Sequence, residues 1–486
     1  MQQNKVGELK QFRLFGLSSL VYIFLASSLF GGSFENFKNT ENVAYEKYRD
    51  KNDIEFTPYL KEVWKEYIVK VSPPLYEKQK PKSIRPAKEI QIKNIGPKVN
   101  IKIPPINKQT KTLNKKKLMQ DKTRDISIDY FGQELGFNID NSISDAQFYP
   151  QSQRGIVNFF DRMASSDYEG TLYEIEEVCK RLNLNDWGVY QLVDQISNAI
   201  YTSPASRELY SWFIFNKLGY EVKIGLGNKF VVLMHYSKKV IYSTPSYSFG
   251  DKKFYVLSSY VKSSLGRIYT YKQNYPNANK ALDLALEELP NFTKNLKSKT
   301  VSFKQFGKVY SSTFSYDVNL IDFMATYPQA DYETYFNAPM SSTAYDQIAL
   351  DMKKHLNKTH SSHAINFVLN FVQKAFEYER DQQQFSREKV MFPDETLYYD
   401  KSDSEDRAIL FAYLVRKLFK ISVIGVKYKD HMATALYIPM KGNSVKVGDR
   451  KFIIADPTYI NANIGQSMPK YKSVIPQNFI MLSYGK

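Results

Sequence analysis

Residues 402–419 read SDSEDRAILFAYLVRKLF and predict the start of a buried helix. Asp403 suits the N-cap position and Asp406 the third helical position, and together they make a capping box. The apolar residues that follow recur at helical spacing: Ile409, Leu410, Tyr413, Leu414 and Leu418. Ser404 is therefore expected in the first turn of this helix, where the helix dipole favours a negative charge.

Two strand patterns follow this helix. Residues 431–438 read HMATALYI, and residues 452–455 read FIIA and end at Asp456. Short apolar runs of this kind are typical of buried strands. If the two strands are antiparallel neighbours, Asp456 lies beside His431, where a carboxylate fixes the tautomer of the imidazole. A helix followed by such strands predicts a unit of the α+β class.

The order of Ser404, His431 and Asp456-Pro457-Thr458 resembles that of the Cys, His and Asp of the transglutaminase-like superfamily, whose fold is papain-like. The resemblance covers residues 340 to 470, and a serine stands where the family has its nucleophilic cysteine. A serine hydroxyl has a much higher pKa than a thiol, so it forms no resting ion pair with the histidine. The resemblance therefore implies a remnant triad that is catalytically silent.

Other interpretations of these residues stay open. Ser404 is also an ordinary helix-start residue, His431 and Asp456 are also a structural hydrogen-bonded pair, and Asp456-Pro457-Thr458 by itself is a turn signal. Serine triads do work where an oxyanion hole has been built for them. The alternative function is therefore an amidase, peptidase or acyl-transferase that acts on protein or cell-wall peptides through Ser404, His431 and Asp456.

The pattern recurs about 200 residues earlier, which predicts an internal repeat. Three pairs of segments align at an offset of 200: Ser203-Pro204-Ala205-Ser206-Arg207 with residues 403–407, Lys217-Leu218 with Lys417-Leu418, and Ile224-Gly225 with Ile424-Gly425. In this first copy the nucleophile, His and Asp-Pro-Thr positions are predicted to be Pro204, Val231 and Thr244-Pro245-Ser246. No triad chemistry is expected there. His235 lies out of register and is interpreted as a core or edge-strand residue.

Residues 1–30 have the pattern of an export signal. Basic residues precede an apolar run of 17 residues, Leu14–Phe30, and Ala26-Ser27-Ser28 offers a small-x-small cleavage site. The run is shorter than the about 20 residues of a membrane span, so a cleaved signal peptide is predicted rather than an anchor. A membrane contact is expected only if this segment stays uncleaved. Together with the bacterial family resemblance, the pattern predicts a periplasmic protein.

The net charge of +17 is unevenly distributed, which argues against a nucleic-acid partner. Residues 78–124 hold 15 basic and two acidic side chains, a net charge of +13, inside a proline-rich segment predicted to be an extended linker, 73–125. Five apolar residues alternate with polar ones there, as in a strand that adds to a partner's sheet: Ile90, Ile92, Val99, Ile101 and Ile103. Two interpretations stay open: a solvated tether, or an arm that docks on envelope proteins, peptidoglycan or lipid head groups.

Cys179 is the only cysteine, so the chain forms no internal disulfide. It lies mid-helix among charged residues and is predicted to be a partly buried structural thiol. The sequence has no clustered Cys and His ligand spacing and no glycine-rich phosphate loop. No cofactor and no metal are therefore expected.

The sequence thus predicts an α+β protein with two transglutaminase-like units. The expected parts are the export segment, a short helical segment over 31–72 that begins at Thr57 and Pro58 and contains Tyr67 and Ile68, the linker over 73–125, a degenerate unit over 150–260, a strand-rich connection over 261–340 and a second unit over 341–486.

Two degenerate copies favour a scaffold over a catalyst, although fold alone does not dictate function. We expect a periplasmic, non-catalytic scaffold or adaptor in a bacterial envelope assembly, such as a flagellar motor or secretion apparatus. The aromatic content of 15% suits assembly interfaces. Envelope proteins are the expected partners, through the arm and the aromatic-rich units.

Overall fold

The computed structural model describes residues 51–76, 79–103, 124–228, 230–258 and 265–482. It divides into two compact units, residues 1–61 and 62–486. In the first unit the described residues, 51–61, are helical. The predicted signal peptide lies outside the described residues. The second unit is mixed α+β, which confirms the α+β part of the prediction.

The first repeat follows a small hairpin and a one-turn helix. Four helices come first: α4 (Gln153–Ala164), α5 (Tyr168–Leu182), α6 (Asp186–Ile200) and α7 (Pro204–Lys217). Five strands follow: β5 (Val222–Leu226), β6 (Val231–Tyr236), β7 (Pro245–Phe249), β8 (Lys252–Tyr255) and β9 (Arg267–Thr270). Ser203 caps α7 and Pro204 is its first residue, which is where proline costs no hydrogen bond.

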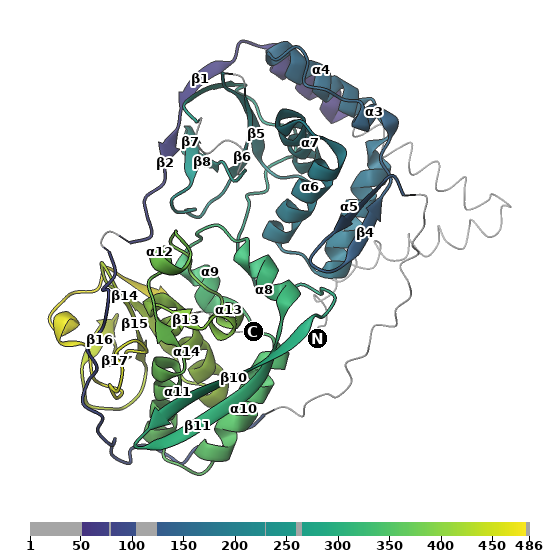
Figure 1. The fold of residues 1–486 in the computed structure, drawn as a ribbon. Coiled ribbons are helices and arrows are strands. Elements are labelled where there is room, and N and C mark those ends of the chain that lie inside the picture. The colour runs from purple at the N-terminus through teal and green to yellow at the C-terminus, as the bar shows by residue number, and fades with distance from the viewer. Residues whose placement is uncertain (1–50, 77–78, 104–123, 229, 259–264, 483–486) are drawn as a thin grey trace, which may run out of the picture. The chain divides into compact units, whose positions relative to one another are not determined.

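The second repeat has the same kind of composition (Figure 1). Its main helices are α10 (Ser342–Leu356), α11 (Ser361–Lys374), α13 (Pro393–Tyr398) and α14 (Ser404–Phe419). Its sheet consists of β14 (Val423–Lys427), β15 (Met432–Leu436), β16 (Ser444–Val447), β17 (Arg450–Ala455) and β18 (Asn478–Met481). The apolar face of this sheet packs a core that includes Ile424, Ala435 and Ile454.

The two sheets have the same strand order. In the second repeat it is β16-β17-β15-β14-β18, and in the first the five matching strands run β7-β8-β6-β5-β9. Helix α7 precedes the first sheet as α14 precedes the second, and β6 packs on α7 as β15 packs on α14. Shared topology supports the internal repeat that a few sequence identities predicted.

The strand register corrects the predicted alignment. The first β-hairpin closes at the pair Leu226 and Val231, whereas the second closes at Lys427 and Met432, so the hairpins match at an offset of 201 rather than 200. Val231 therefore corresponds to Met432, and the counterpart of His431 is Phe230. The second copy has one more residue than the first between the start of the helix and the start of the following strand, which explains the change of offset. Strand residues that were aligned at an offset of 200 therefore face opposite sides of their sheets.

The predicted counterpart of Asp456 is also wrong. Thr244-Pro245-Ser246 leads into β7, and β7 matches β16 in the strand order. Asp456 follows β17, whose counterpart is β8. The proline-containing turn signal in the first copy therefore belongs to a different strand end.

The connection between the repeats is only partly made of strands. It contains β9 and a long hairpin of β10 (Leu296–Gln305) and β11 (Lys308–Asp317), and then two helices, α8 (Val318–Ala325) and α9 (Tyr332–Asn337). A smaller hairpin, β3 (Ile126–Asp129) and β4 (Glu134–Phe137), and helix α3 (Asn141–Ser144) precede the first repeat. Among the described helices, none is long and apolar enough to cross a membrane.

The helix predicted to begin at Thr57 and to run through Tyr67 and Ile68 is wrong at both ends, because residues 51–61 are helical and the helix does not continue to Tyr67. Tyr67 and Ile68 lie in strand β1 (Lys65–Ile68), which pairs with β9, and β2 (Lys70–Val71) pairs with β7. The sheet order is thus β1-β9-β5-β6-β8-β7-β2. One stretch, 65–71, therefore pairs with both edges of the first sheet, and this tertiary pairing overrides the helical pattern.

Residues 73–76 and 79–103 are described, and we call them the strap; from Leu75 on their hydrogen bonds given below go to the second repeat. Ala87 N–H donates to Ile460 O at 2.9 Å, Ser361 N–H to Pro97 O at 2.8 Å, and Val99 N–H to Thr359 O at 2.8 Å. Ile101 is buried, while Ile90 stays half exposed. The described half of the predicted linker thus docks on its own chain, and residues 104–123 lie outside the described residues.

Candidate active site at the start of helix α14

Helix α14 begins at Ser404, as the capping pattern predicted. Asp403 is the N-cap, and its N–H donates to the Asp406 carboxylate at 3.1 Å within a capping box. Both aspartates are fully buried. The local sequence therefore fixes Ser404 in the first turn, at the position where papain-like chemistry needs its nucleophile.

His431 and Asp456 lie side by side, also as predicted. His431 directly precedes β15 and Asp456 directly follows β17, and because these strands are antiparallel, the start of β15 lies beside the end of β17. His431 Nε2 lies 2.9 Å from Asp456 Oδ2, and both side chains are at most 2% exposed. The ring of Tyr471 stacks on the imidazole with centroids 4.8 Å apart. The pair of a base and its orienting carboxylate is thus present and rigidly held.

Ser404 is not bonded to this pair. Its hydroxyl donates to Glu405 Oε2 at 3.1 Å and accepts the N–H of Met432 at 3.2 Å. Among the described residues no hydrogen bond joins Ser404 to His431, and His431 Nδ1 is buried without a hydrogen-bond partner. The structure therefore gathers all three predicted residues in one place but engages the serine elsewhere.

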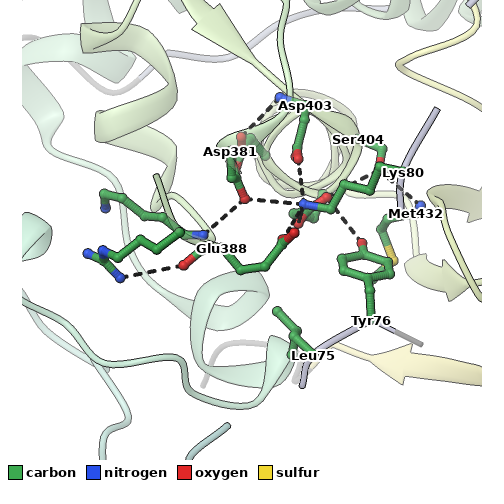
Figure 2. A network of polar contacts seen from close by, with 12 residues as sticks. Leu75, Tyr76, Lys80, Asp381, Glu388, Asp403, Ser404 and Met432 are labelled. Atoms are coloured by element: carbon green, nitrogen blue, oxygen red, sulfur yellow. Dashed lines mark hydrogen bonds and ion pairs between the residues drawn. The ribbon is translucent and has the colours of Figure 1, made fainter. Parts of the chain in front are cut away.

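Two strap residues cover the serine (Figure 2). Lys80 Nζ lies 2.5 Å from Asp403 Oδ2 and 2.6 Å from Glu405 Oε1, and Tyr76 Oη donates to Glu405 Oε2 at 3.1 Å. Lys80 and Tyr76 are 4% and 7% exposed. The sequence interpretation missed both, because Lys80 counted only as one charge of a basic linker.

Lys80 keeps Glu405 ionised. Burial, the largest single effect, raises the pKa of the Glu405 carboxyl, but the Lys80 ammonium together with the hydrogen bonds that the carboxylate accepts holds that pKa below its ordinary value. Burial likewise opposes the charged form of Lys80, yet Asp403 and Glu405 hold the Lys80 pKa well above its ordinary value. Ser404 thus donates its proton to an anion.

An anion beside the serine opposes acyl chemistry. The attack of Ser404 on a carbonyl would create a negative oxyanion, which enzymes stabilise with hydrogen-bond donors. Here the nearest acceptor of the serine proton is a carboxylate rather than an imidazole, and its charge would repel that oxyanion. The site can hold a proton and a hydrogen-bond network, but it is poorly arranged for nucleophilic catalysis.

Arg407 connects the first turn of α14 to neighbouring backbone. Its guanidinium is fully buried and donates to Gln373 O, Phe376 O and Ser402 Oγ at 3.1, 2.7 and 3.1 Å. These bonds join the start of α14 to the end of α11. The sequence alignment singled out this arginine only as one of the few identities between the repeats.

The other candidate nucleophile and base are inert. Cys179 lies in α5, as predicted, and burial raises the pKa of its thiol to about 12, so the thiolate is absent at neutral pH. His235 lies in β6, where burial lowers its pKa to about 3 and Phe215 and Tyr190 pack edge-on against it. His235 is therefore a neutral core residue.

No protein-family model, no curated protein and no solved structure matches this chain.

Proposed function

We propose that this chain is a non-catalytic scaffold or adaptor built on two transglutaminase-like units, the second of which retains a remnant triad. The single observation that supports the loss of catalysis most is the bond from Ser404 to Glu405, under a cover formed by Tyr76 and Lys80. The first repeat offers Pro204 at the nucleophile position, so neither copy carries a working set.

The proposal extends to where the protein acts. From the sequence of residues 1–30 we propose export to the periplasm, and from the repeated units we propose a place in an envelope assembly such as a flagellar motor or secretion apparatus. Fractionation of the producing cells tests the first part. Recovery in the periplasm with an N-terminus beyond residue 26 supports it, and recovery in the cytoplasm contradicts it.

Catalysis is tested by a fluorophosphonate probe, which phosphonylates activated serines with loss of fluoride. We expect no labelling of the wild-type chain and the same background in Ser404→Ala. Labelling that Ser404→Ala abolishes would instead establish the alternative, an amidase, peptidase or acyl-transferase, because the retained pair of His431 and Asp456 would then be a working base.

The cellular counterpart replaces Ser404 with alanine in the organism that makes the protein, at an unchanged protein level. A scaffold predicts that this strain behaves as wild type while a full deletion is defective. If the alanine strain reproduces the defect of the deletion, Ser404 is needed for its chemistry and the scaffold proposal fails.

A further inference from the structure

The strap places one cation among five carboxylates, which we call the carboxylate cluster: Asp381, Glu388, Asp403, Glu405 and Asp406. Lys80 Nζ lies 2.5 to 3.2 Å from oxygens of four of them, Asp403, Glu405, Glu388 and Asp381. Figure 2 shows Asp381, Glu388 and Asp403 converging on the Lys80 ammonium. A single point in the fold is thus surrounded by carboxylate oxygens from separate residues.

The Lys80 ammonium does not contact every oxygen of the carboxylate cluster. Asp381 Oδ1 and Asp403 Oδ1 have no hydrogen-bond partner, although their side chains are only 1% and 0% exposed. Oxygens of Asp381, Asp403 and Asp406 lie within 4.8 Å of one another, and so do those of Asp381, Glu388 and Glu405. Buried, unpartnered carboxylate oxygens are costly unless a proton or a cation satisfies them, and burial raises the pKa of the Asp381 and Asp403 carboxyls well above its ordinary value.

The donor set selects a class of cation. It consists of oxygens alone, without nitrogen or sulfur, which favours hard divalent ions over zinc or copper. Calcium takes six to eight oxygen ligands at about 2.3–2.6 Å and tolerates irregular geometry, whereas magnesium demands a near-ideal octahedron. Four oxygens that already surround one point at slightly longer distances need only a small contraction to hold calcium.

We propose that the carboxylate cluster is a calcium site in which Lys80 is the resident substitute cation, and that calcium binds in place of the ammonium and displaces strap residues 75–76 and 79–81. Two cations cannot occupy one point, so calcium binding and strap docking oppose each other, and each weakens the other by the same factor. Displacement also removes Tyr76 from Glu405 and uncovers the start of α14. This inference does not depend on whether Ser404 is catalytic.

The strap is suited to leave. Residues 79–97 form no helix and no strand, so withdrawal breaks individual bonds rather than a cooperative ladder. Around Lys80 these bonds are the ion pairs of its ammonium, the bond from Tyr378 Oη to Pro81 O, and that from Lys427 Nζ to Leu75 O. Calcium would supply the charge that the strap takes away.

The test uses the full chain, first stripped of metal with a chelator. Calcium chloride is titrated calorimetrically, and hydrogen exchange of peptides that cover residues 73–85 is followed by mass spectrometry. We expect one calcium ion per chain and at least a tenfold faster exchange of these peptides, with unchanged exchange in β6. Lys80→Met removes the competing ammonium and should tighten calcium binding at least tenfold. The matched control is Lys82→Met, an exposed lysine on the same strap, which should leave the affinity unchanged.

A second variant keeps the test decisive if Lys80→Met does not fold. Asp381→Asn removes one carboxylate but leaves Lys80 its contacts with Asp403 and Glu405, and should weaken calcium binding at least tenfold. The proposal is overturned if no calcium binds at millimolar concentration to the wild type or the variants. It is equally overturned if calcium binds but leaves the exchange of the strap unchanged. Serine labelling by the probe is a separate readout, so failure here leaves the scaffold proposal standing.

Discussion

The buried guanidinium of Arg407 donates three hydrogen bonds, which no pattern in the sequence indicated. Its removal in Arg407→Met leaves the carbonyls of Gln373 and Phe376 without their donor inside the fold. Each orphaned group costs about 1–3 kcal/mol, so we expect a loss of several kcal/mol in the free energy of unfolding, measured by urea denaturation.

The repeat provides the matched control. Arg207 occupies the equivalent helix position, donates to Tyr201 O at 2.6 Å and is only half-buried. We expect Arg207→Met to cost clearly less than Arg407→Met. Equal losses would mean that the buried bonds of Arg407 contribute little beyond the packing that both arginines share.

Glu208 makes the stability of the first repeat depend on pH. Burial raises the pKa of this carboxyl from 4.5 to about 7, and its Oε2 accepts the N–H of Leu233 at 2.7 Å. The folded state thus binds a proton that the unfolded state has already lost. Stability is full below pH 4.5 and falls as the pH rises toward 7, by up to about 3 kcal/mol.

Glu208→Gln removes that titration but keeps an oxygen for Leu233. We expect the variant to be more stable than the wild type at pH 8 and no more stable at pH 4.5, measured by thermal melting across this range. The exposed Glu287→Gln serves as the control and should leave the pH profile unchanged. A Glu208→Gln profile parallel to that of the wild type would contradict a raised pKa.

The proximity of Ser404, His431 and Asp456 could be predicted from the sequence, whereas the residues that cover Ser404 could not. Ser404, His431 and Asp456 lie at the ends of local patterns, a capped helix and two apolar strands, which elementary rules recognise. Lys80 reaches Glu405 across 325 positions of the chain. Hydrophobic periodicity does not predict a contact between residues so far apart in the chain. In a linker of net charge +13, the sequence does not distinguish one buried lysine from the exposed lysines around it.

Among the helices and strands, the topology of the repeat was predictable and the register was not. The starts of helices α7 and α14 could be predicted from their N-cap residues, Ser203 and Asp403. Strands β5 and β14 are buried on both faces, so their apolar residues do not alternate and a slip of one residue leaves no trace in the pattern. The two aligned glycines consequently face opposite sides of their sheets.

Gly425 tests this placement. A Cβ at this position of β14 would lie 2.9 Å from Phe336 Cζ and 3.1 Å from Ile480 Cβ. We expect Gly425→Ala to cost about 1–3 kcal/mol by overpacking, measured as a lower urea midpoint.

Gly170 is the opposite case. It lies inside α5, and nothing stands within 4 Å of an added Cβ. Alanine favours a helix interior by about 1 kcal/mol over glycine. Gly170 is the third residue of α5, in its first turn, so Gly170→Ala should stabilise the protein by less than that amount. A loss of stability at Gly170, or none at Gly425, would show that local packing differs from that described above.

For the molecule as a whole, the N-terminal boundary of the folded body lies earlier than the predicted domains suggested. Residues 62–486 form one compact unit, and its sheet includes β1 and β2. The test compares a chain that begins at Glu62, which keeps both strands, with a chain that begins at Ser72. A chain that begins at Ser72 loses both strands and should melt earlier and aggregate, as judged by light scattering. Equal behaviour of the two truncations would show that closure of the sheet contributes nothing.

The stretch 65–71 that pairs with both sheet edges also sets an order of events during biosynthesis. Its partner in β9 ends at Thr270, so the closing stretch leaves the ribosome long before the strand that it needs. At about 5–20 residues per second, the roughly 200 residues between them take about 10–40 s to synthesise. Throughout that interval the partner strand of β1 has not been synthesised. A chaperone that binds extended apolar segments would act during this interval.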